Sequence, residues 1–446
     1  MTSRPVNSSR DALERRKLSK FGIRISEFRM KFNIVPAIVF LATTVLVQAE
    51  DSLPDVKFVP LNSLTEAAEN QATEPASSSA TSASYTAEAL PQEDSAQTPY
   101  GLPRELMPLW ESLSIKQKAA QMVMVYLTSS QFIIENEIGG VLITGQHLRS
   151  AKRYLNTMAE IDSGLRIPLV VATDQEGGIV NRLASYSDTW RGVPSALEMR
   201  RMDSTDIHSL ANKIGSALKE LKINMNLAPV LDPSKDSRGK NSFMEESRRS
   251  WGNDTTNAFK VRAFVKGMSE NGVVCVSKHF PGYDSWTNSD HQIAVSATPR
   301  AKIAKNVGFF KTLADDIPVT MMSSVSFVRI SSRPAVFEPK IVKMARDMSP
   351  ETVILTDDLW GVSLRAWISG NERVRSKNYP AKDFRKLVRT ALMAGNDMFM
   401  ITYSSKAVEM INYLAALSKQ SKYYRQRIEE SAARILKMKY KAGIIK

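Results

Sequence analysis

The chain has 446 residues, of which 43% are apolar, and its formal net charge is +14. This length exceeds that of one small domain, and the apolar content supports a large buried core. The single cysteine, Cys275, excludes an internal disulfide. The four histidines form neither an HExxH motif nor a cluster with cysteine, so we expect no metal site.

The charge is distributed unevenly along the chain. Residues 1–31 carry a net charge of +6, residues 50–100 carry −8, and residues 101–446 carry +16. A basic body suits anionic surroundings such as a membrane, cell-wall polymers or nucleic acid. No nucleic-acid-binding motif accompanies the charge, so we expect no nucleic-acid partner. We therefore expect the positive charge of residues 101–446 to serve either solubility or contact with an anionic membrane or cell wall.

Residues 1–49 have the pattern of an export signal. A basic start is followed by the uncharged apolar run 34–47, IVPAIVFLATTVLV, and by small residues that include an acceptable cleavage site at Val47-Gln48-Ala49. This run is short for a spanning helix, so it favours a signal peptide, with an uncleaved membrane anchor as the alternative. Either way the rest of the chain is expected to be extracytoplasmic: periplasmic, in the cell envelope or secreted.

Residues 50–100 are rich in Ala, Ser, Thr, Glu, Gln and Pro, with SSSATSAS near their centre. Few aromatic or β-branched residues are present. Such a segment cannot bury enough apolar surface to offset its chain entropy. We therefore predict a disordered linker here, followed by one folded domain over residues 101–446.

From residue 101 onward, apolar β-rich runs alternate with amphipathic helical stretches such as 204–222 and 256–271. Eight runs predict strands: 121–126, 139–143, 168–174, 223–230, 273–279, 318–324, 352–357 and 396–402. This alternation is typical of βαβ units and a parallel sheet. Eight repeats favour a closed (β/α)8 TIM-like barrel of the α/β class over an open sheet.

The stretch TVILTDDLWG, residues 352–361, indicates where the chemistry lies. A short buried run ends abruptly in two carboxylates, Asp357 and Asp358. In a (β/α) barrel, a polar residue at the carboxyl end of a strand indicates catalysis, although either aspartate could instead cap the next helix.

Other predicted strands also end in polar residues, which should converge at one mouth of the barrel: Asp174, Glu176, Asp232, Lys278 and His279. The long segment 231–255 is expected to be a loop over this face.

Several strings together resemble glycoside hydrolase family 3, in particular its single-domain bacterial β-N-acetylglucosaminidases. They are DQEGGIVNR at 174–182, NMNLAPVLD at 224–232, KHFPG at 278–282, TDDL at 356–359 and AGNDM at 394–398. The resemblance covers about residues 105–440. It implies a barrel that hydrolyses β-linked N-acetylglucosamine from glycans with retention, through a covalent glycosyl-aspartate intermediate and without a cofactor or metal.

The resemblance also implies roles for individual residues. Asp357 looks like the nucleophile, and Asp174, Lys278 and His279 look like ligands of the sugar hydroxyls. Arg249, in the string RSWG, resembles an arginine that binds the same sugar. Each of these binding residues could instead have a purely structural role. Asp174 could cap a loop, and Lys278 and His279 could pair with a structural carboxylate. Arg249 could be an exposed loop residue.

The loop after KHFPG departs from the family pattern. The family's acid/base is a histidine paired with an aspartate two positions before it, and His291 falls on that histidine in KHFPGYDSWTNSDH. Ser289 stands where the aspartate is expected, and Tyr283 stands at the first loop histidine. Asp290 could pair with His291 only if the loop backbone shifts, because consecutive side chains usually point apart.

Two hypotheses follow. In the first, the protein is an exported retaining glycosidase that acts on cell-wall glycan fragments, with Asp357 as nucleophile and His291 as proton donor. In the second, it is a catalytically impaired barrel that binds glycan or wall material as a scaffold. The changes at Ser289 and Tyr283 favour the second. Two further departures, Ile179 for an arginine and Ser324 for a histidine, indicate altered substrate choice or lost activity. Retention of Asp357 favours the first, which we prefer.

Overall fold

A computed structural model describes residues 98–446 apart from Val374. The predictions of a signal or anchor over residues 1–49 and of a linker up to residue 97 lie outside the described residues. Within residues 98–446, no helix combines the length and the apolar character needed to cross a membrane.

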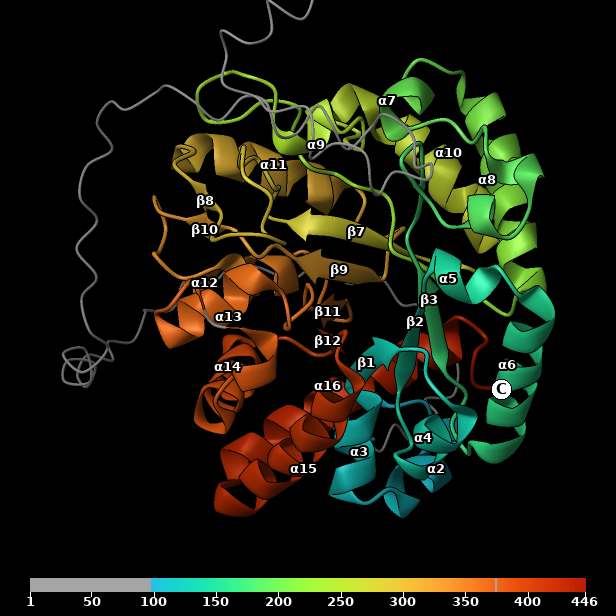
Figure 1. Cartoon of the computed structure of the whole chain (residues 1–446), viewed down its shortest axis with the longest axis vertical. Coiled ribbons are helices and arrows are strands. Elements are labelled where there is room, and N and C mark those ends of the chain that lie inside the picture. The colour runs from blue at the N-terminus through green and yellow to red at the C-terminus, as the bar shows by residue number, and fades with distance from the viewer. Residues whose placement is uncertain (1–97, 374) are drawn as a thin grey trace, which may run out of the picture. The chain divides into compact units, whose positions relative to one another are not determined.

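The centre of the fold is an eight-stranded parallel sheet (Figure 1). The strands are β1 (Val123–Tyr126), β2 (Gly140–Ile143), β3 (Val170–Thr173), β6 (Met225–Asn226), β7 (Val274–Phe280), β9 (Val319–Met322), β11 (Val353–Leu355) and β12 (Phe399–Ile401). Each pairs with the next one along the chain, and β12 returns to pair with β1. A parallel bridge between Leu355 and Met398 joins β11 to the β12 side and completes the ring. The predicted (β/α)8 barrel is confirmed.

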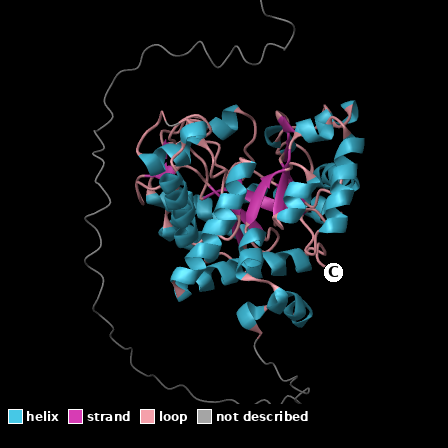
Figure 2. Ribbon diagram, turned by 60° about the horizontal axis from the view of Figure 1, so that its bottom comes forward, coloured by secondary structure: helices cyan, strands magenta, loops and turns pink. Residues whose placement is uncertain are grey.

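Helices surround these strands (Figure 2). In chain order they are α2 (Met107–Ser112), α3 (Ile115–Gln121), α4 (Ser130–Glu135), α5 (Gly145–Leu148), α6 (Ala151–Gly164), α7 (Ala196–Met199), α8 (Ser204–Glu220), α9 (Phe243–Glu246), α10 (Ala258–Ser269), α11 (Arg300–Thr312), α12 (Pro339–Arg346), α13 (Val362–Ser369), α14 (Ala381–Ala394), α15 (Ser404–Gln420) and α16 (Lys422–Lys441).

The elements form where the local pattern predicts them. In α8 the buried positions include Ile207, Ala211, Ile214 and Leu218, which recur every three or four residues and form one apolar stripe. These residues belong to the main hydrophobic core, and α8 packs closely against α10. The strands are buried on both faces, as in β11, whose three residues are fully buried.

All eight predicted strands are present, but one is much shorter than expected. The run 223–230 forms a strand only over Met225–Asn226. Pro229 lies in the predicted run and has no N–H to donate, so the regular ladder stops before it. An isolated parallel bridge between Val230 and Lys278 then resumes the pairing with β7.

Two additional pairs of short strands lie in the loops that follow the carboxyl ends of barrel strands. β4 (Gln175–Gly177) and β5 (Val180–Asn181) form an antiparallel pair directly after β3. β8 (Val295–Ser296) and β10 (Ser326–Phe327) pair in parallel in the loops after β7 and β9. The segment 231–255 is largely loop, as expected, and contains only the short helix α9.

Candidate active site

Asp357 lies just past the carboxyl end of β11, and two donors fix its carboxylate. Ser324, which follows β9, donates its hydroxyl to Oδ2 at 2.8 Å. The backbone N–H of Asp358 donates to Oδ1 at 2.8 Å. The side chain is only half-buried, so it remains open to the barrel mouth. A partly open carboxylate with both oxygens oriented suits a nucleophile.

The neighbouring carboxylate, Asp358, is used differently. It accepts hydrogen bonds from the backbone N–H of Trp360 at 2.9 Å and from the hydroxyl of Thr402 at 2.6 Å. Burial raises the pKa of Asp358 to about 6. Asp358 therefore ties the loop after β11 to the end of β12, and Asp357 is the candidate nucleophile of the pair.

A compact ion cluster lies at the ends of β3 and β7. Lys278 Nζ lies 2.8 Å from Asp174 Oδ1 and 2.6 Å from Glu176 Oε1. Arg249 binds Glu176 with two hydrogen bonds, from Nε at 2.8 Å and from a terminal nitrogen at 2.9 Å. This fork geometry fixes the arginine plane. Arg182 adds a third cation 3.7 Å from Asp174, so the cluster contains two carboxylates and three cations and carries a net positive charge.

The electrostatics of the cluster favour the ionised forms of Glu176 and Lys278. Burial alone would raise the pKa of Glu176, but the charges of Arg249 and Lys278 hold it well below its usual value. Burial alone would lower the pKa of Lys278, but Asp174 and Glu176 raise it. Asp174 is more exposed than Lys278 and Glu176, at 22% of its side chain. Asp174 can therefore accept hydrogen bonds from a ligand while the others hold it in place.

His279 is anchored to a different carboxylate, Asp232, which is fully buried. Asp232 accepts the backbone N–H of His279 at 2.8 Å and lies 2.7 Å from its ring Nδ1. This pairing makes Nδ1 the donor and leaves Nε2 to meet a ligand. The register of β7 against β9 shifts between Ser277 and Phe280. Such an irregularity re-aims side chains, and successive residues Lys278 and His279 both reach this end of the barrel.

The loop predicted to carry the proton donor contains no histidine–carboxylate pair. Ser289 is buried, and its backbone N–H donates to the hydroxyl of Tyr283 at 2.8 Å. The side chain of His291 is exposed, and within residues 98–446 its ring makes no hydrogen bond. Asp290 lies beside it on the same loop.

Sequence reasoning predicted the positions of these residues but missed two partners that hold them. Glu176 joins Arg249 to Lys278, and Asp232 orients His279. Both had been noted only as polar residues at strand ends. That same signal could have identified them, because buried carboxylates at a barrel mouth need cationic or N–H partners.

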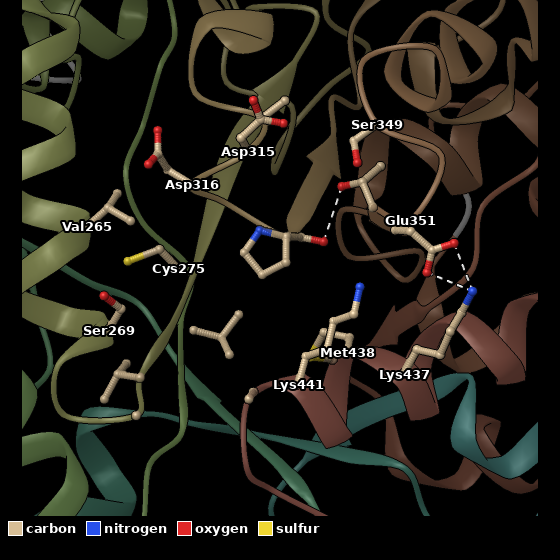
Figure 3. Close-up of a pocket in the computed structure, with 17 residues that line it drawn as sticks. Val265, Ser269, Cys275, Asp315, Asp316, Ser349, Glu351, Lys437, Met438 and Lys441 are labelled. Carbon is tan, nitrogen blue, oxygen red and sulfur yellow. Dashed lines mark hydrogen bonds and ion pairs between the residues drawn. The ribbon is translucent and has the colours of Figure 1, made fainter. Parts of the chain in front are cut away.

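A cavity of about 520 Å³ opens at the opposite end of the barrel (Figure 3). Its lining includes Val274 at the start of β7, Pro318 before β9 and Thr352 before β11. At its edge Lys437 forms an ion pair with Glu351 at 2.7 Å. Barrels of this kind react at the carboxyl ends of their strands, so we assign no catalytic role to this cavity. In the described part of the chain, no group of three or more His, Cys, Asp or Glu side chains is placed to hold a metal ion.

The fold is a (β/α)8 barrel, and carboxylates and cationic side chains gather at the carboxyl ends of its strands. The family model described as the glycosyl hydrolase family 3 N terminal domain matches residues 114–438, and the chain belongs to this family. It is therefore a glycosidase, an enzyme that acts on O-glycosyl bonds.

Two curated relatives are similar in sequence. A beta-hexosaminidase of Pseudomonas aeruginosa is 26% identical over 299 residues, which cover 65% of this chain and 82% of that protein. Beta-hexosaminidase LpqI of Mycobacterium tuberculosis is 29% identical over 243 residues, which cover 52% of this chain and 58% of that protein.

Solved structures share the fold. A beta-N-acetylhexosaminidase from Beutenbergia cavernae superposes with a TM-score of 0.62 at 26% identity, covering 74% of this chain and 99% of that one. A family 3 beta-N-acetylglucosaminidase from Paenibacillus superposes with a TM-score of 0.63 at 24% identity, covering 75% of this chain and 63% of that one. The second likeness concerns the fold alone.

Proposed function

We propose that this enzyme is a retaining β-N-acetylhexosaminidase that removes terminal β-linked N-acetylglucosamine from glycans. The observation that carries the proposal is the oriented, half-buried carboxylate of Asp357 at the mouth that also holds the Asp174, Lys278 and Arg249 cluster. The names of the relatives, beta-hexosaminidase and beta-N-acetylhexosaminidase, support the choice of sugar.

In this mechanism Asp357 attacks the anomeric carbon while a donor on the loop after β7 protonates the leaving oxygen. The family pattern assigns that proton to His291. Asp174, Lys278, Arg249 and His279 bind the sugar hydroxyls through charged hydrogen bonds, which fix the ring for in-line attack. Water then releases the sugar from Asp357, and the anomeric configuration is retained.

We also propose that the enzyme works outside the cytoplasm on cell-wall glycan fragments. The apolar run 34–47 with its basic start supports export, as a cleaved signal or as an anchor. The net charge of +16 over residues 101–446 would favour contact with an anionic wall or membrane. The proposed export is tested by fusing residues 1–49 to a reporter that is active only after export. Retention of the reporter in the cytoplasm would contradict it.

The activity is tested with an activated aryl N-acetyl-β-glucosaminide and an aryl β-glucoside, using the full chain. We expect turnover of the first compound and a loss of about a thousandfold or more in Asp357→Ala, because the covalent step disappears. Asp315→Asn, an exposed aspartate that lines the cavity at the other end of the barrel, is the matched control.

The same assay distinguishes the hydrolase from a second candidate function, a barrel that binds glycan as a scaffold. Ser289 and Tyr283 replace the family's charged and imidazole groups, which favours a barrel that binds glycan without cleaving it. Intact binding of N-acetylglucosamine oligomers with no turnover of either aryl glycoside would establish that scaffold role and refute the hydrolase. Faster turnover of the β-glucoside would instead reassign the sugar.

A further inference from the structure

The outward side of α14 carries a stripe of cations. Four exposed side chains recur at the spacing i, i+3, i+4 and i+7, which places them on one side of the helix: Lys382, Arg385, Lys386 and Arg389. The opposite side of α14 is buried in the main hydrophobic core. Met393 lies one turn further along the stripe and is 41% exposed. Burial of the apolar side therefore fixes the cationic side toward solvent.

The loop between α13 and α14 extends this stripe. Arg373, Arg375 and Lys377 lie on the loop and are exposed. With the four cations of α14 they bring residues 371–389 to seven cations against two acids, Glu372 and Asp383, a net charge of +5. We refer to the seven cations as the basic face: Arg373, Arg375, Lys377, Lys382, Arg385, Lys386 and Arg389.

The charge of the basic face is not neutralised by the rest of the domain. Among the residues that the structure describes, none of the seven cations forms an ion pair with a carboxylate, whereas the exposed Lys343 of α12 pairs with Asp347. Lys386 Nζ donates to the carbonyl of Ile368 at 3.3 Å, a neutral acceptor that leaves its charge uncompensated. Like charges at i and i+4 weaken a helix slightly, so the stability of α14 does not account for the stripe.

The basic face begins beside the mouth of the barrel. Trp360 follows Asp357 by three residues, and its ring centroid lies 5.5 Å from that of Tyr379 in the loop and 5.9 Å from that of Phe384 in α14. These contacts hold the start of α14 near the carboxyl end of β11. The helix then leads to the start of β12, at the other end of the barrel. The basic face therefore runs along the outside of the barrel from the rim of the mouth.

The form of the basic face suits a lipid surface. It is the outer side of a helix and a loop, and the cavity at the opposite end of the barrel includes none of its residues. An anionic bilayer presents headgroups that move laterally and meet cations at any spacing, whereas a bound peptide needs a groove or a sheet edge. Met393 adds an exposed apolar side chain beside the cations.

We propose that the basic face docks the domain on an anionic lipid bilayer. This inference narrows the proposed contact with an anionic wall or membrane to one face of the domain and one partner. It rests on the proposed location and not on the proposed chemistry, because docking needs no substrate. If residues 1–49 stay in the membrane as an anchor, the bilayer is already close, and a weak surface contact then suffices to hold the mouth beside it.

The first test measures sedimentation with vesicles of phosphatidylcholine, with and without phosphatidylglycerol. It uses residues 50–446, because the closed barrel and its core lie within residues 98–446 and the apolar run 34–47 would bind vesicles by itself. We expect binding only where phosphatidylglycerol is present. Binding should be lost when the ionic strength rises from about 0.1 M to about 1 M, because the Debye length falls from about 10 Å to about 3 Å.

Neutralising the stripe of α14 should weaken this binding about a hundredfold or more, because each Lys or Arg near an anionic surface strengthens binding about fivefold. The variant combines four changes to a residue that also favours helices: Lys382→Gln, Arg385→Gln, Lys386→Gln and Arg389→Gln. Its urea midpoint should match that of the unaltered chain, which shows that the fold is kept.

Four exposed cations on the other side of the barrel provide the matched control: Lys152 and Arg153 of α6, and Lys213 and Lys219 of α8. The strand order places β3, which precedes α8, opposite β11, which precedes α14 (Figure 1). Changing these four residues to Gln removes the same charge. Binding should stay within about twofold of the unaltered chain, because a surface more than a Debye length away is screened.

A second measurement uses the full chain and reports which face touches the bilayer. An environment-sensitive dye is attached to Met393→Cys or, as the control, to Lys213→Cys; Cys275 is buried and does not compete for the dye. We expect the emission of the dye at position 393 to shift to the blue with vesicles that contain phosphatidylglycerol and not with phosphatidylcholine alone. The dye at position 213 should not respond to either.

Three results would overturn the proposal. Equal loss of binding in the two four-residue variants would show that net charge attracts the vesicle and that the basic face does not. Retention on polyphosphate beads without binding to vesicles would identify an anionic polymer as the partner. Binding to neither would mean that the basic face is solvated, or is covered by acidic residues of the chain such as those in 50–100. Failure to hydrolyse the aryl glycosides is a separate result, because it bears on the proposed function alone.

Discussion

At the scale of single residues, the carboxylate of Asp357 depends on one hydroxyl that the family pattern does not contain. Ser324 stands where a histidine is often found, and its hydroxyl donates to Asp357 Oδ2 at 2.8 Å. Ser324 therefore orients the carboxylate of the proposed nucleophile.

We predict that Ser324→Ala lowers kcat/KM about tenfold, because the Asp357 carboxylate loses the hydroxyl that orients its Oδ2. A hydrogen bond to a charged group contributes about 1.5–3 kcal/mol. The rate is measured on an activated aryl N-acetyl-β-glucosaminide, with the exposed Ser332→Ala as control. Equal kcat/KM in Ser324→Ala and in the unaltered chain would show that the hydroxyl does not position Asp357.

At the scale of elements, one buried aspartate joins helices to strands at the end of the barrel away from the site. Asp397 is fully buried just before β12, and its carboxylate contacts Arg346 of α12 and Arg427 and Arg434 of α16. It also accepts the backbone N–H of Ile354 in β11 at 3.0 Å. Burial alone would raise the pKa of Asp397, but the three guanidinium groups lower it.

We predict that Asp397→Asn lowers the free energy of unfolding by about 3–5 kcal/mol, because it leaves partly buried arginines without their countercharge. The folded-state pKa lies below the unfolded value, so this stabilisation is present above about pH 4 and is lost as the pH falls through the folded-state value. Urea unfolding between pH 3 and pH 7 measures it.

The exposed pair of Lys343 and Asp347 offers a matched control on α12. Asp347→Asn should cost less than about 1 kcal/mol at every pH, since water screens such a pair. Equal losses in the two variants would mean that the Asp397 cluster does not hold the elements together.

At the scale of the whole molecule, α16 connects the last part of the barrel domain to its first strands. Lys439 is fully buried, and its Nζ donates to Gln121 Oε1 at 2.7 Å, to the Gly139 carbonyl at 3.0 Å and to the Pro168 carbonyl at 2.8 Å. These acceptors lie at the end of α3 and just before β2 and β3. One side chain therefore links segments that are about 300 residues apart in the chain.

We predict that Lys439→Met lowers the free energy of unfolding by about 2–4 kcal/mol, because three buried acceptors lose a shared donor. Lys441→Met, an exposed change on the same helix, should alter it by about 0.5 kcal/mol or less. Denaturant unfolding measures both. Activity at 25 °C should not change, since Lys439 lies at the end of the barrel opposite Asp357, and a lost activity with unchanged stability would contradict this account.

The fold could be predicted from the sequence because its determinants are local. Each barrel strand is a short apolar run that needs burial on both faces, and each helix has its own apolar stripe. Eight such repeats in order left few topologies other than a closed barrel. The strand at 223–230 was overestimated because apolar character alone does not reveal where Pro229 ends a ladder.

The sequence by itself determined which side chains reach the mouth, because Asp174, Lys278 and Asp357 each follow or end a strand and parallel strands all end on one side. Only the tertiary structure decided how they are paired. Glu176 lies 73 residues from Arg249 in the chain and binds it with two hydrogen bonds. Such contacts depend on distances between loops that no local pattern encodes.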